Sequence, residues 1–124
     1  MIKGIGTDII EINRIKKAIE RESFLVKYFT ENERWQFLDK KNRAETIAGV
    51  FSAKESVVKA MGTGFSGFSS SDIEILKDEK GKPFVNVFNN AKEICDKKGI
   101  DAIHVSITHC KDYAQSFAVA EGGL

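Results

Sequence analysis

The feature that most limits how this chain folds is a long apolar segment in its middle, residues 43–61. Its pattern predicts one helix that ends at Gly62, because glycine readily takes the left-handed conformation found just past a helix C-terminus. Apolar residues leave this helix little room for a solvated face, so we expect it to be largely buried. Its apolar positions include Ala48, Val50, Phe51, Ala53, Val57, Val58, Ala60 and Met61.

Charged residues interrupt the apolar part of this helix, and two of them share a face. Glu55 and Lys59 are four residues apart, so they lie on one helical face. On a solvated helix such a pair is an ordinary surface ion pair that contributes about 0.3–0.5 kcal/mol. In partly apolar surroundings the two charges need strong partners. A metal ion bound to the carboxylate and a phosphate bound to the ammonium would satisfy both.

A second candidate carboxylate stands in the first predicted strand, residues 1–10. Asp8 lies there among apolar residues, after Gly4 and Gly6, which permit close approach of another backbone. Alone, Asp8 is equally consistent with a carboxylate that caps a loop. Two carboxylates at one site repel each other, and a divalent cation relieves the repulsion. Mg²⁺ prefers one or two carboxylates together with waters and phosphate oxygens. Asp8 is therefore a candidate metal ligand when it is combined with Glu55.

The remaining pattern mixes helices with short strands. Thr30 and Glu33 have the spacing of a capping box, which predicts the start of a helix. The last two strands are consecutive and joined by a short connection, which favours an α+β fold, an antiparallel sheet with packed helices. The predicted helices span residues 13–21, 30–40 and 89–98, and the further predicted strands span residues 72–76, 84–88, 103–108 and 113–120.

Local signals add detail to these elements. Asn13 is predicted to cap the first helix, and Asn89 or Asn90 the last one, which Gly99 ends. The strand at residues 113–120 alternates bulky with small side chains, so its small face permits close approach of a second layer. The apolar side of the helix at residues 30–40 is predicted to consist of Trp35, Phe37 and Leu38.

Composition narrows the function classes. The 124 residues fit one domain, and the net charge of +1 gives no global attraction to nucleic acid or to an anionic membrane. Cys95 and Cys110 form neither a disulfide framework nor a metal-site spacing, which favours free thiols in a reducing cytoplasm. The N-terminal segment lacks the features of a signal peptide, and no apolar run approaches the ~20 residues of a membrane span. These observations predict a cytoplasmic protein.

Two motifs resemble those of a known family. The segment Gly4-Ile5-Gly6-Thr7-Asp8 and the segment from Phe51 to Lys59 (FSAKESVVK) are similar to the signatures of the holo-acyl-carrier-protein synthases, compact bacterial 4′-phosphopantetheinyl transferases. The likeness continues through Gly62-Thr63-Gly64, through residues 71–75 and 81–83, and through residues 104–109. It covers essentially the whole chain, so the resemblance implies a single transferase domain over residues 1–124.

The resemblance implies a reaction. Family members bind coenzyme A with Mg²⁺, and a serine of apo-acyl-carrier protein attacks the β-phosphate. Phosphopantetheine is transferred in fatty acid biosynthesis, and adenosine 3′,5′-bisphosphate leaves. Asp8 and Glu55 match the metal ligands, and Lys59 matches the lysine beside the pyrophosphate, so these three are the candidate catalytic residues. Two candidates remain for the general base that takes the serine proton, Glu55 and a metal-bound water next to it.

The resemblance also implies further contacts. Gly62, Gly64 and His109 are candidate coenzyme A contacts, although the glycines are equally consistent with a helix end and the histidine with a hydrogen-bonded strand end. Lys54 belongs to the signature or is a solvated lysine, and His104 is given no role. The 3′-phosphate needs a cation, for which Lys41 and Arg43 are candidates. The candidate docking stripe for the acidic carrier protein is Arg14, Lys17 and Arg21, otherwise a solvated helix face.

The chain departs from the family pattern at three positions. Val50 stands where the family often has arginine, so a nucleotide contact from that residue is absent or comes from elsewhere. Ser52 and Ser56 replace alanines, small-for-small changes that leave the metal assignment intact. The family is trimeric, with active sites between protomers, so a homotrimer is expected.

Two rival interpretations remain. A related transferase with broader carrier specificity would be about twice as long, which the chain length argues against. A nonenzymatic coenzyme A or nucleotide-binding module on the same fold would need neither Asp8 nor Glu55, and both are present.

Overall fold

The long central helix forms as predicted and organises the molecule. The structure, a computed structural model, describes residues 1–123, and in it Gly62 ends helix α4 with a left-handed φ of 78°. The elements in chain order are β1 (Ile2–Glu11), α1 (Ile12–Ala18), α2 (Glu22–Tyr28), α3 (Glu31–Asp39), α4 (Ala44–Met61), the 3₁₀ turn η1 (Ser70–Asp72), β2 (Ile73–Lys77), β3 (Pro83–Val87), α5 (Asn89–Lys98), β4 (Ala102–His109) and β5 (Tyr113–Glu121).

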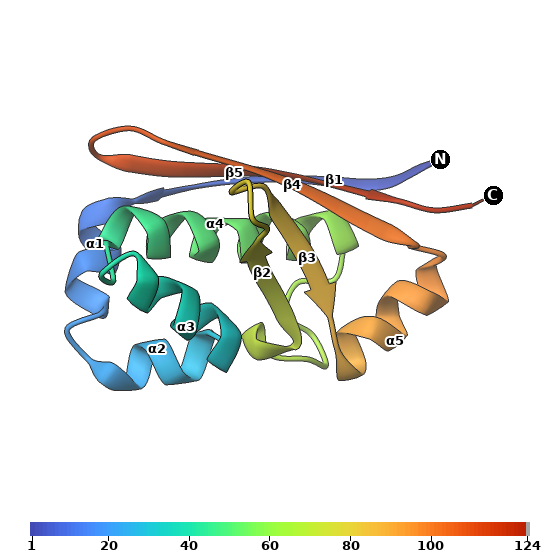
Figure 1. Cartoon of the computed structure of the whole chain (residues 1–124). Helices are drawn as coiled ribbons and strands as arrows, with labels where there is room; N and C mark the ends of the chain where they lie inside the picture. The colour runs from blue at the N-terminus through green and yellow to red at the C-terminus, as the bar shows by residue number, and fades with distance from the viewer. Residues whose placement is uncertain (124) are drawn as a thin grey trace.

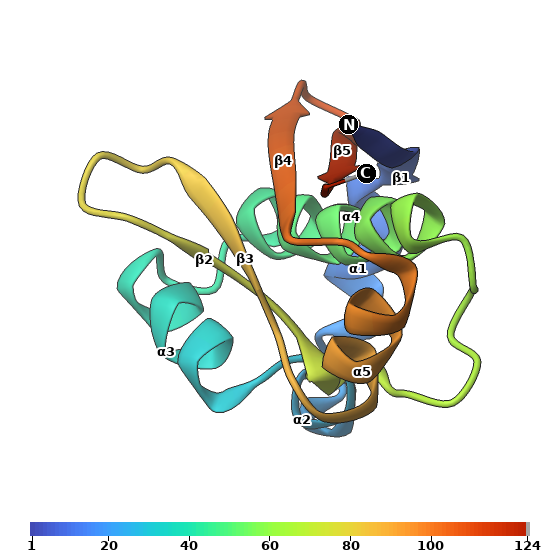
Figure 2. The same ribbon diagram turned by 90° about the vertical axis from the view of Figure 1, so that its right-hand side faces the viewer.

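The strands form two antiparallel groups on opposite sides of α4. One is a three-stranded sheet in the order β1-β5-β4, and the other is the β2–β3 hairpin. The three-stranded sheet runs along one side of α4, while the hairpin and the other helices lie on the opposite side (Figure 1). In Figure 2 the β2–β3 hairpin passes below α4, and the two chain termini lie close together. The predicted α+β fold with an antiparallel sheet is confirmed.

Small residues let the sheet approach α4 closely. The buried face of β5 consists of small side chains, as its alternation predicted, and the glycines of β1 lie directly on the helix. A Cβ at Gly4 would lie 2.0 Å from the Ala60 carbonyl oxygen, and one at Gly6 would lie 2.0 Å from the Ser56 carbonyl oxygen. The two glycines therefore serve helix–strand packing. The small residues of β5 are Ala114, Ser116, Ala118 and Ala120.

A buried ion pair joins the other side of α4 to α3. Lys54 Nζ lies 2.7 Å from Glu33 Oε1, and neither side chain is more than 2% exposed. The Lys54 ammonium also donates to the carbonyl oxygens of Tyr28 and Ser70. Glu33 accepts from the backbone N–H groups of Thr30 and Ile75, so the predicted capping box at Thr30 forms and extends into β2. Lys54 is thus buried, and the alternative prediction of a solvated lysine at this position was wrong.

Several local predictions were wrong because tertiary contacts decide them. Helix α2 was not predicted, since its N-cap residue, Arg21, makes no side-chain cap. The N-cap of α1 is Glu11, not Asn13. The N-cap of α5 is Phe88, because Asn89 and Asn90 use their side chains to hold Asp72 and the Gly67 carbonyl instead. In α3 only one of the predicted apolar residues is buried, Phe37, while Trp35 and Leu38 are exposed.

Candidate active site

Asp8 reaches α4 because of how β1 packs. Gly6 sits against the helix backbone, and Asp8, two residues further along the strand, faces the same way. The Asp8 side chain is only 16% exposed. The opposing helix surface carries Glu55 and, one turn later, Lys59. The sheet and the helix therefore bring together three residues that lie up to 51 positions apart in sequence.

Lys59 holds the two elements together at this point. Its ammonium donates to the carbonyl oxygen of Thr7 at 2.8 Å and lies 3.5 Å from Asp8 Oδ1. The Lys59 side chain is 55% exposed, so its charge is also presented to solvent and to any bound anion. The lysine lies beside the acidic pair, the place that a cation neutralising a substrate phosphate would need.

The negative charge of Asp8 acts on Glu55 across the contact between β1 and α4. Partial burial is the main cause that raises the pKa of Glu55 above its usual value of 4.5, and the negative charge of Asp8 raises it further. Lys59 opposes this rise. A site where one carboxylate repels another is stabilised by additional positive charge. The pair is therefore suited to bind a cation.

The donor set fits magnesium. Within residues 1–123 no cluster of three or more histidine, cysteine or acidic residues is arranged to hold a metal. Asp8 and Glu55 thus provide two hard oxygen donors without a complete protein cage. Mg²⁺ characteristically binds this way, through one or two carboxylates while waters and substrate phosphates fill the remaining positions.

The predicted coenzyme A contacts fall into two groups. Lys59 and Gly62 border a cavity of about 410 Å³ near the C-terminal end of α4, and Gly64 follows in an open, left-handed position. Lys41 and Arg43 precede the N-terminus of α4. The 18 residues of α4 span about 27 Å, so one chain does not bring the two groups together.

His109 lies with Lys41 and Arg43, in the group of contacts near the N-terminal end of α4. It ends β4, where it pairs with Ala114, which in turn pairs with Ile10 near the end of β1. The predicted histidine contact is therefore separated along the sheet from Gly62 and Gly64. His104, to which no role was given, lies on the same strand and pairs with Glu121 at 2.6 Å.

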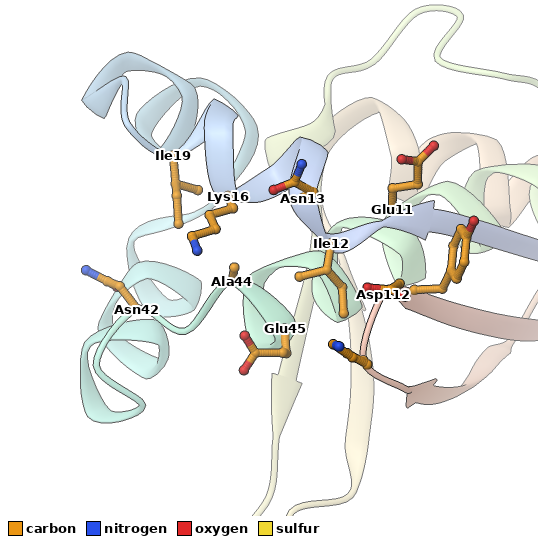
Figure 3. Close-up of a pocket in the computed structure, with 11 residues that line it drawn as sticks. Glu11, Ile12, Asn13, Lys16, Ile19, Asn42, Ala44, Glu45 and Asp112 are labelled. Carbon is orange, nitrogen blue, oxygen red and sulfur yellow. The ribbon is translucent and has the colours of Figure 1, made fainter.

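The cavity at this end is open and mixed in charge. Its volume is about 670 Å³, and it lies between α1, the start of α4 and the β4–β5 hairpin (Figure 3). Asn42, just before α4, lines it, but neither Asp8 nor Glu55 does. The cavity is therefore separate from the carboxylate pair. Its charged lining residues are Glu11, Lys16, Glu45, Lys111 and Asp112.

Known proteins resemble this chain over nearly its whole length. A model of the 4′-phosphopantetheinyl transferase superfamily matches residues 4–118. The holo-[acyl-carrier-protein] synthase of Clostridium novyi is 52% identical over 98% of this chain and 88% of its own length. That of Alkaliphilus metalliredigens is 50% identical over 97% of this chain and 99% of its own length. The chain belongs to the holo-acyl-carrier-protein synthase family of 4′-phosphopantetheinyl transferases.

Solved structures of the family share the fold. The Helicobacter pylori holo-[acyl-carrier-protein] synthase in complex with coenzyme A superposes with a TM-score of 0.83 at 32% identity, covering 94% of this chain and 99% of that one. The Bacillus anthracis synthase in complex with CoA (3′,5′-ADP) gives a TM-score of 0.80 at 38% identity, covering 99% of each chain. As a phosphopantetheinyl transferase, this chain is an enzyme.

The candidate docking stripe of this transferase forms a groove. Arg14, Lys17 and Arg21 all line a cavity of about 500 Å³ between α1 and α2. Phe24 and Tyr28 also line it. The groove has a fourth cation, Lys27, which was not predicted because the pattern of helix α2 was not recognised.

Other lysines near the predicted contacts were also missed. Lys3 and Lys98 line the cavity beside Gly62, and Lys98 donates to the Met61 carbonyl oxygen at the end of α4. The only sequence signal for Lys98 is its place in the last turn of α5. Val50, where the family often has arginine, is buried and lines a cavity of about 430 Å³. The lysines around that cavity are Lys40, Lys77 and Lys80.

Proposed function

We propose that this protein transfers 4′-phosphopantetheine from coenzyme A to a serine of apo-acyl-carrier protein, with Mg²⁺ as cofactor, in fatty acid biosynthesis. The observation that carries the proposal is the convergence of Asp8 and Glu55, with Lys59 beside them. Family membership supports the reaction class. Related synthases have been solved with coenzyme A bound, which supports the same co-substrate here.

The proposal assigns a role to each of these three residues. Asp8 and Glu55 would hold Mg²⁺, which when bound polarises the pyrophosphate for attack. The serine oxygen forms a bond to the β-phosphorus, and the bond from that phosphorus to the bridging oxygen breaks. Lys59 stabilises the charge that grows on the departing adenosine 3′,5′-bisphosphate. Glu55, or a metal-bound water next to it, would take the serine proton.

The remaining cofactor contacts are proposed to come from two protomers. Gly62 and Gly64 would contact the coenzyme A of one site, and His109, Lys41 and Arg43 would act at the other end of the helix. A homotrimer with sites between protomers would reunite the two groups. The exposed face of the three-stranded sheet supports such an assembly, because it presents large apolar side chains. They are Ile5, Ile9, Tyr113 and Phe117, each between 46% and 61% exposed.

Carrier-protein docking is proposed for the basic groove between α1 and α2. Arg14, Lys17 and Arg21 would steer an acidic partner, and Lys27 adds to the same field. The apolar Phe24 and Tyr28 in the groove would give the partner a surface to bury. The partners are thus coenzyme A and apo-acyl-carrier protein.

The proposal extends to the whole chain and its place in the cell. Residues 1–124 would form one transferase domain. The reducing cytoplasm is the proposed location, since Cys95 and Cys110 are both free thiols. No helix within residues 1–123 combines the length and apolar character needed to cross a bilayer.

Intact-mass analysis tests the function directly. Apo-acyl-carrier protein incubated with this protein, coenzyme A and Mg²⁺ should gain the mass of one phosphopantetheine group, and a chelator should abolish the gain. A nonenzymatic coenzyme A-binding module would leave the mass unchanged while still binding coenzyme A. Light scattering tests the assembly, and a stable, fully active monomer would rule out shared sites.

A further inference from the structure

Three serine hydroxyl groups are buried together where α4 meets the sheet. Ser52 and Ser56 lie one turn apart on α4, and Ser116 lies on β5; none is more than 2% exposed. Ser116 Oγ lies 2.8 Å from Ser52 Oγ and donates to Ser56 Oγ at 2.9 Å. Buried hydroxyls require hydrogen-bond partners, so the three must act as one chain. Their small size alone does not describe them, because hydrogen bonds join all three.

The hydroxyl chain has two different ends. At one end, Ser56 donates to the carbonyl oxygen of Ala53 at 3.1 Å, within α4 itself. At the other end, Ser52 donates to the carbonyl oxygen of Asp8 at 3.2 Å, on β1. Of these two ends, only the Ser52 end ties the helix to the strand that carries Asp8.

Counting hydrogens shows how the two ends depend on each other. Three hydroxyl groups carry three hydrogens, but four contacts require one each. When Ser56 donates to Ala53 and Ser116 donates to Ser56, the hydrogen of Ser52 is shared between Ser116 and the carbonyl oxygen of Asp8. Removing the Ser116 hydroxyl would therefore strengthen the contact to Asp8, whereas removing the Ser52 hydroxyl would abolish it.

We propose that Ser52 is a positioning residue for the metal site: its hydroxyl holds the backbone of Asp8 against α4 and so sets the separation of the Asp8 and Glu55 carboxylates. The inference rests on the proposed function, in which both carboxylates bind one divalent ion. Ser52 and Glu55 are three residues apart on α4, so they lie on neighbouring positions of one helix face. This face of α4 thus carries Glu55 itself and holds Asp8 through the contact of Ser52 to its carbonyl oxygen.

The separation of two metal ligands is sensitive to small shifts. Mg²⁺ needs its ligand oxygens at about 2.0–2.1 Å in near-octahedral geometry, so displacement of the Asp8 backbone is transmitted to the ion. Groups that orient metal ligands typically contribute about 10–100-fold to metal affinity. Lys59, which donates to the neighbouring Thr7 carbonyl from an exposed position, cannot replace a buried contact on Asp8.

Three single variants of the full-length protein test the proposal: Ser52→Ala, Ser116→Ala and the matched control Ser56→Ala. Mn²⁺ is the probe, and its dissociation constant is measured by electron paramagnetic resonance with coenzyme A at saturation. Ser52→Ala should weaken Mn²⁺ binding by about tenfold. The other two variants should bind within about threefold of the wild type, because each keeps the Ser52 contact to Asp8.

A second readout separates positioning from general loss of packing. Each variant removes one buried hydroxyl, so Ser52→Ala and Ser56→Ala should lower the thermal unfolding midpoint by similar amounts. Only Ser52→Ala should raise the metal concentration needed for half-maximal transfer while leaving the KM for carrier protein unchanged. Wild-type Mn²⁺ affinity in Ser52→Ala overturns the proposal, as does an equal loss in Ser52→Ala and Ser56→Ala.

Two further variants keep this inference distinct from the proposed function. If Asp8→Asn and Glu55→Gln bind Mn²⁺ as the wild type does, the pair holds no metal and the proposed function fails with it. If both variants lose Mn²⁺ binding while Ser52→Ala keeps it, the metal site stands and only the role of Ser52 is refuted.

Discussion

Replacing Lys54 by methionine is expected to destabilise the protein strongly. Its buried ammonium donates to Glu33 at 2.7 Å, to the Tyr28 carbonyl at 2.7 Å and to the Ser70 carbonyl at 2.9 Å. Methionine removes all three contacts and leaves the Glu33 carboxylate buried without a countercharge. Breaking a buried ion pair from one side costs about 3–5 kcal/mol. Since domains of this size are stable by about 5–15 kcal/mol, the variant should lose a large part of its free energy of unfolding.

The loss should depend on pH in a defined direction. Burial raises the pKa of Glu33 above its usual value of 4.5, and the charge of Lys54 opposes that rise. Without Lys54 the folded-state pKa of Glu33 rises further, while its unfolded-state pKa does not change. An acid whose pKa is higher in the folded state loses stability as the pH rises from the unfolded to the folded value. The deficit of Lys54→Met should therefore be largest at neutral pH and shrink as the pH falls toward 4.5.

Urea unfolding of both proteins at about pH 7.5 and about pH 5 measures this deficit. Protein concentration must be equal throughout, because self-association would raise the apparent stability. Lys97→Met is the control, since Lys97 lies exposed on α5 and its loss should change the free energy of unfolding by under about 0.5 kcal/mol. A Lys54→Met deficit below about 1 kcal/mol at pH 7.5, or one that grows at pH 5, would refute the reasoning.

Three further predictions concern the site. Glu55→Gln and Asp8→Asn should keep the far-UV circular dichroism of the wild type but lose about 10²–10³-fold in transfer rate; near-normal turnover at saturating Mg²⁺ would contradict the assignment. Arg14→Glu should raise the KM for carrier protein and spare that for coenzyme A, and equal effects on both would argue against docking there. Gly6→Ala should lower the free energy of unfolding by about 1–3 kcal/mol or more, because its Cβ would meet the Ser56 carbonyl oxygen at 2.0 Å; an unchanged urea midpoint would show that β1 does not pack as described.

The elements that were predicted well carry local signals. The capping box of Thr30 and Glu33 and the helix-ending glycines Gly62 and Gly99 each act within one turn, so their structure follows from neighbouring residues. The alternation of large and small residues in β5 likewise identified its buried face. These signals sufficed for the α+β fold and the antiparallel sheet.

The features that were missed depend on distant partners. Lys54 is buried because Glu33 and two carbonyl groups reach it from other elements, which its sequence neighbours do not reveal. Trp35 and Leu38 are exposed because α3 packs through Phe37 alone among the predicted residues. Ser52 has a carbonyl partner 44 residues away, so it appeared only as a small residue.

The candidate site likewise contains residues whose meeting was predicted and residues whose meeting was not found. Asp8, Glu55 and Lys59 were predicted to meet. The packing of β1 on α4 places Lys59 Nζ 3.5 Å from Asp8 Oδ1, and the charges of both residues act on Glu55. The proposed contacts to coenzyme A did not assemble within one chain, because Gly62 and Arg43 lie at opposite ends of α4. A pattern within one sequence cannot distinguish residues that meet within a protomer from residues that meet between protomers.

The central claim is that Asp8 and Glu55 bind the same divalent ion, and crystallography with Mn²⁺ and coenzyme A tests it most directly. Anomalous scattering locates Mn²⁺ independently of the protein atoms. We predict one peak within direct coordination distance, about 2.0–2.3 Å, of an oxygen from each carboxylate and of a coenzyme A phosphate oxygen. A peak that contacts neither carboxylate, or two carboxylates that lie too far apart to share one ion, would contradict the account.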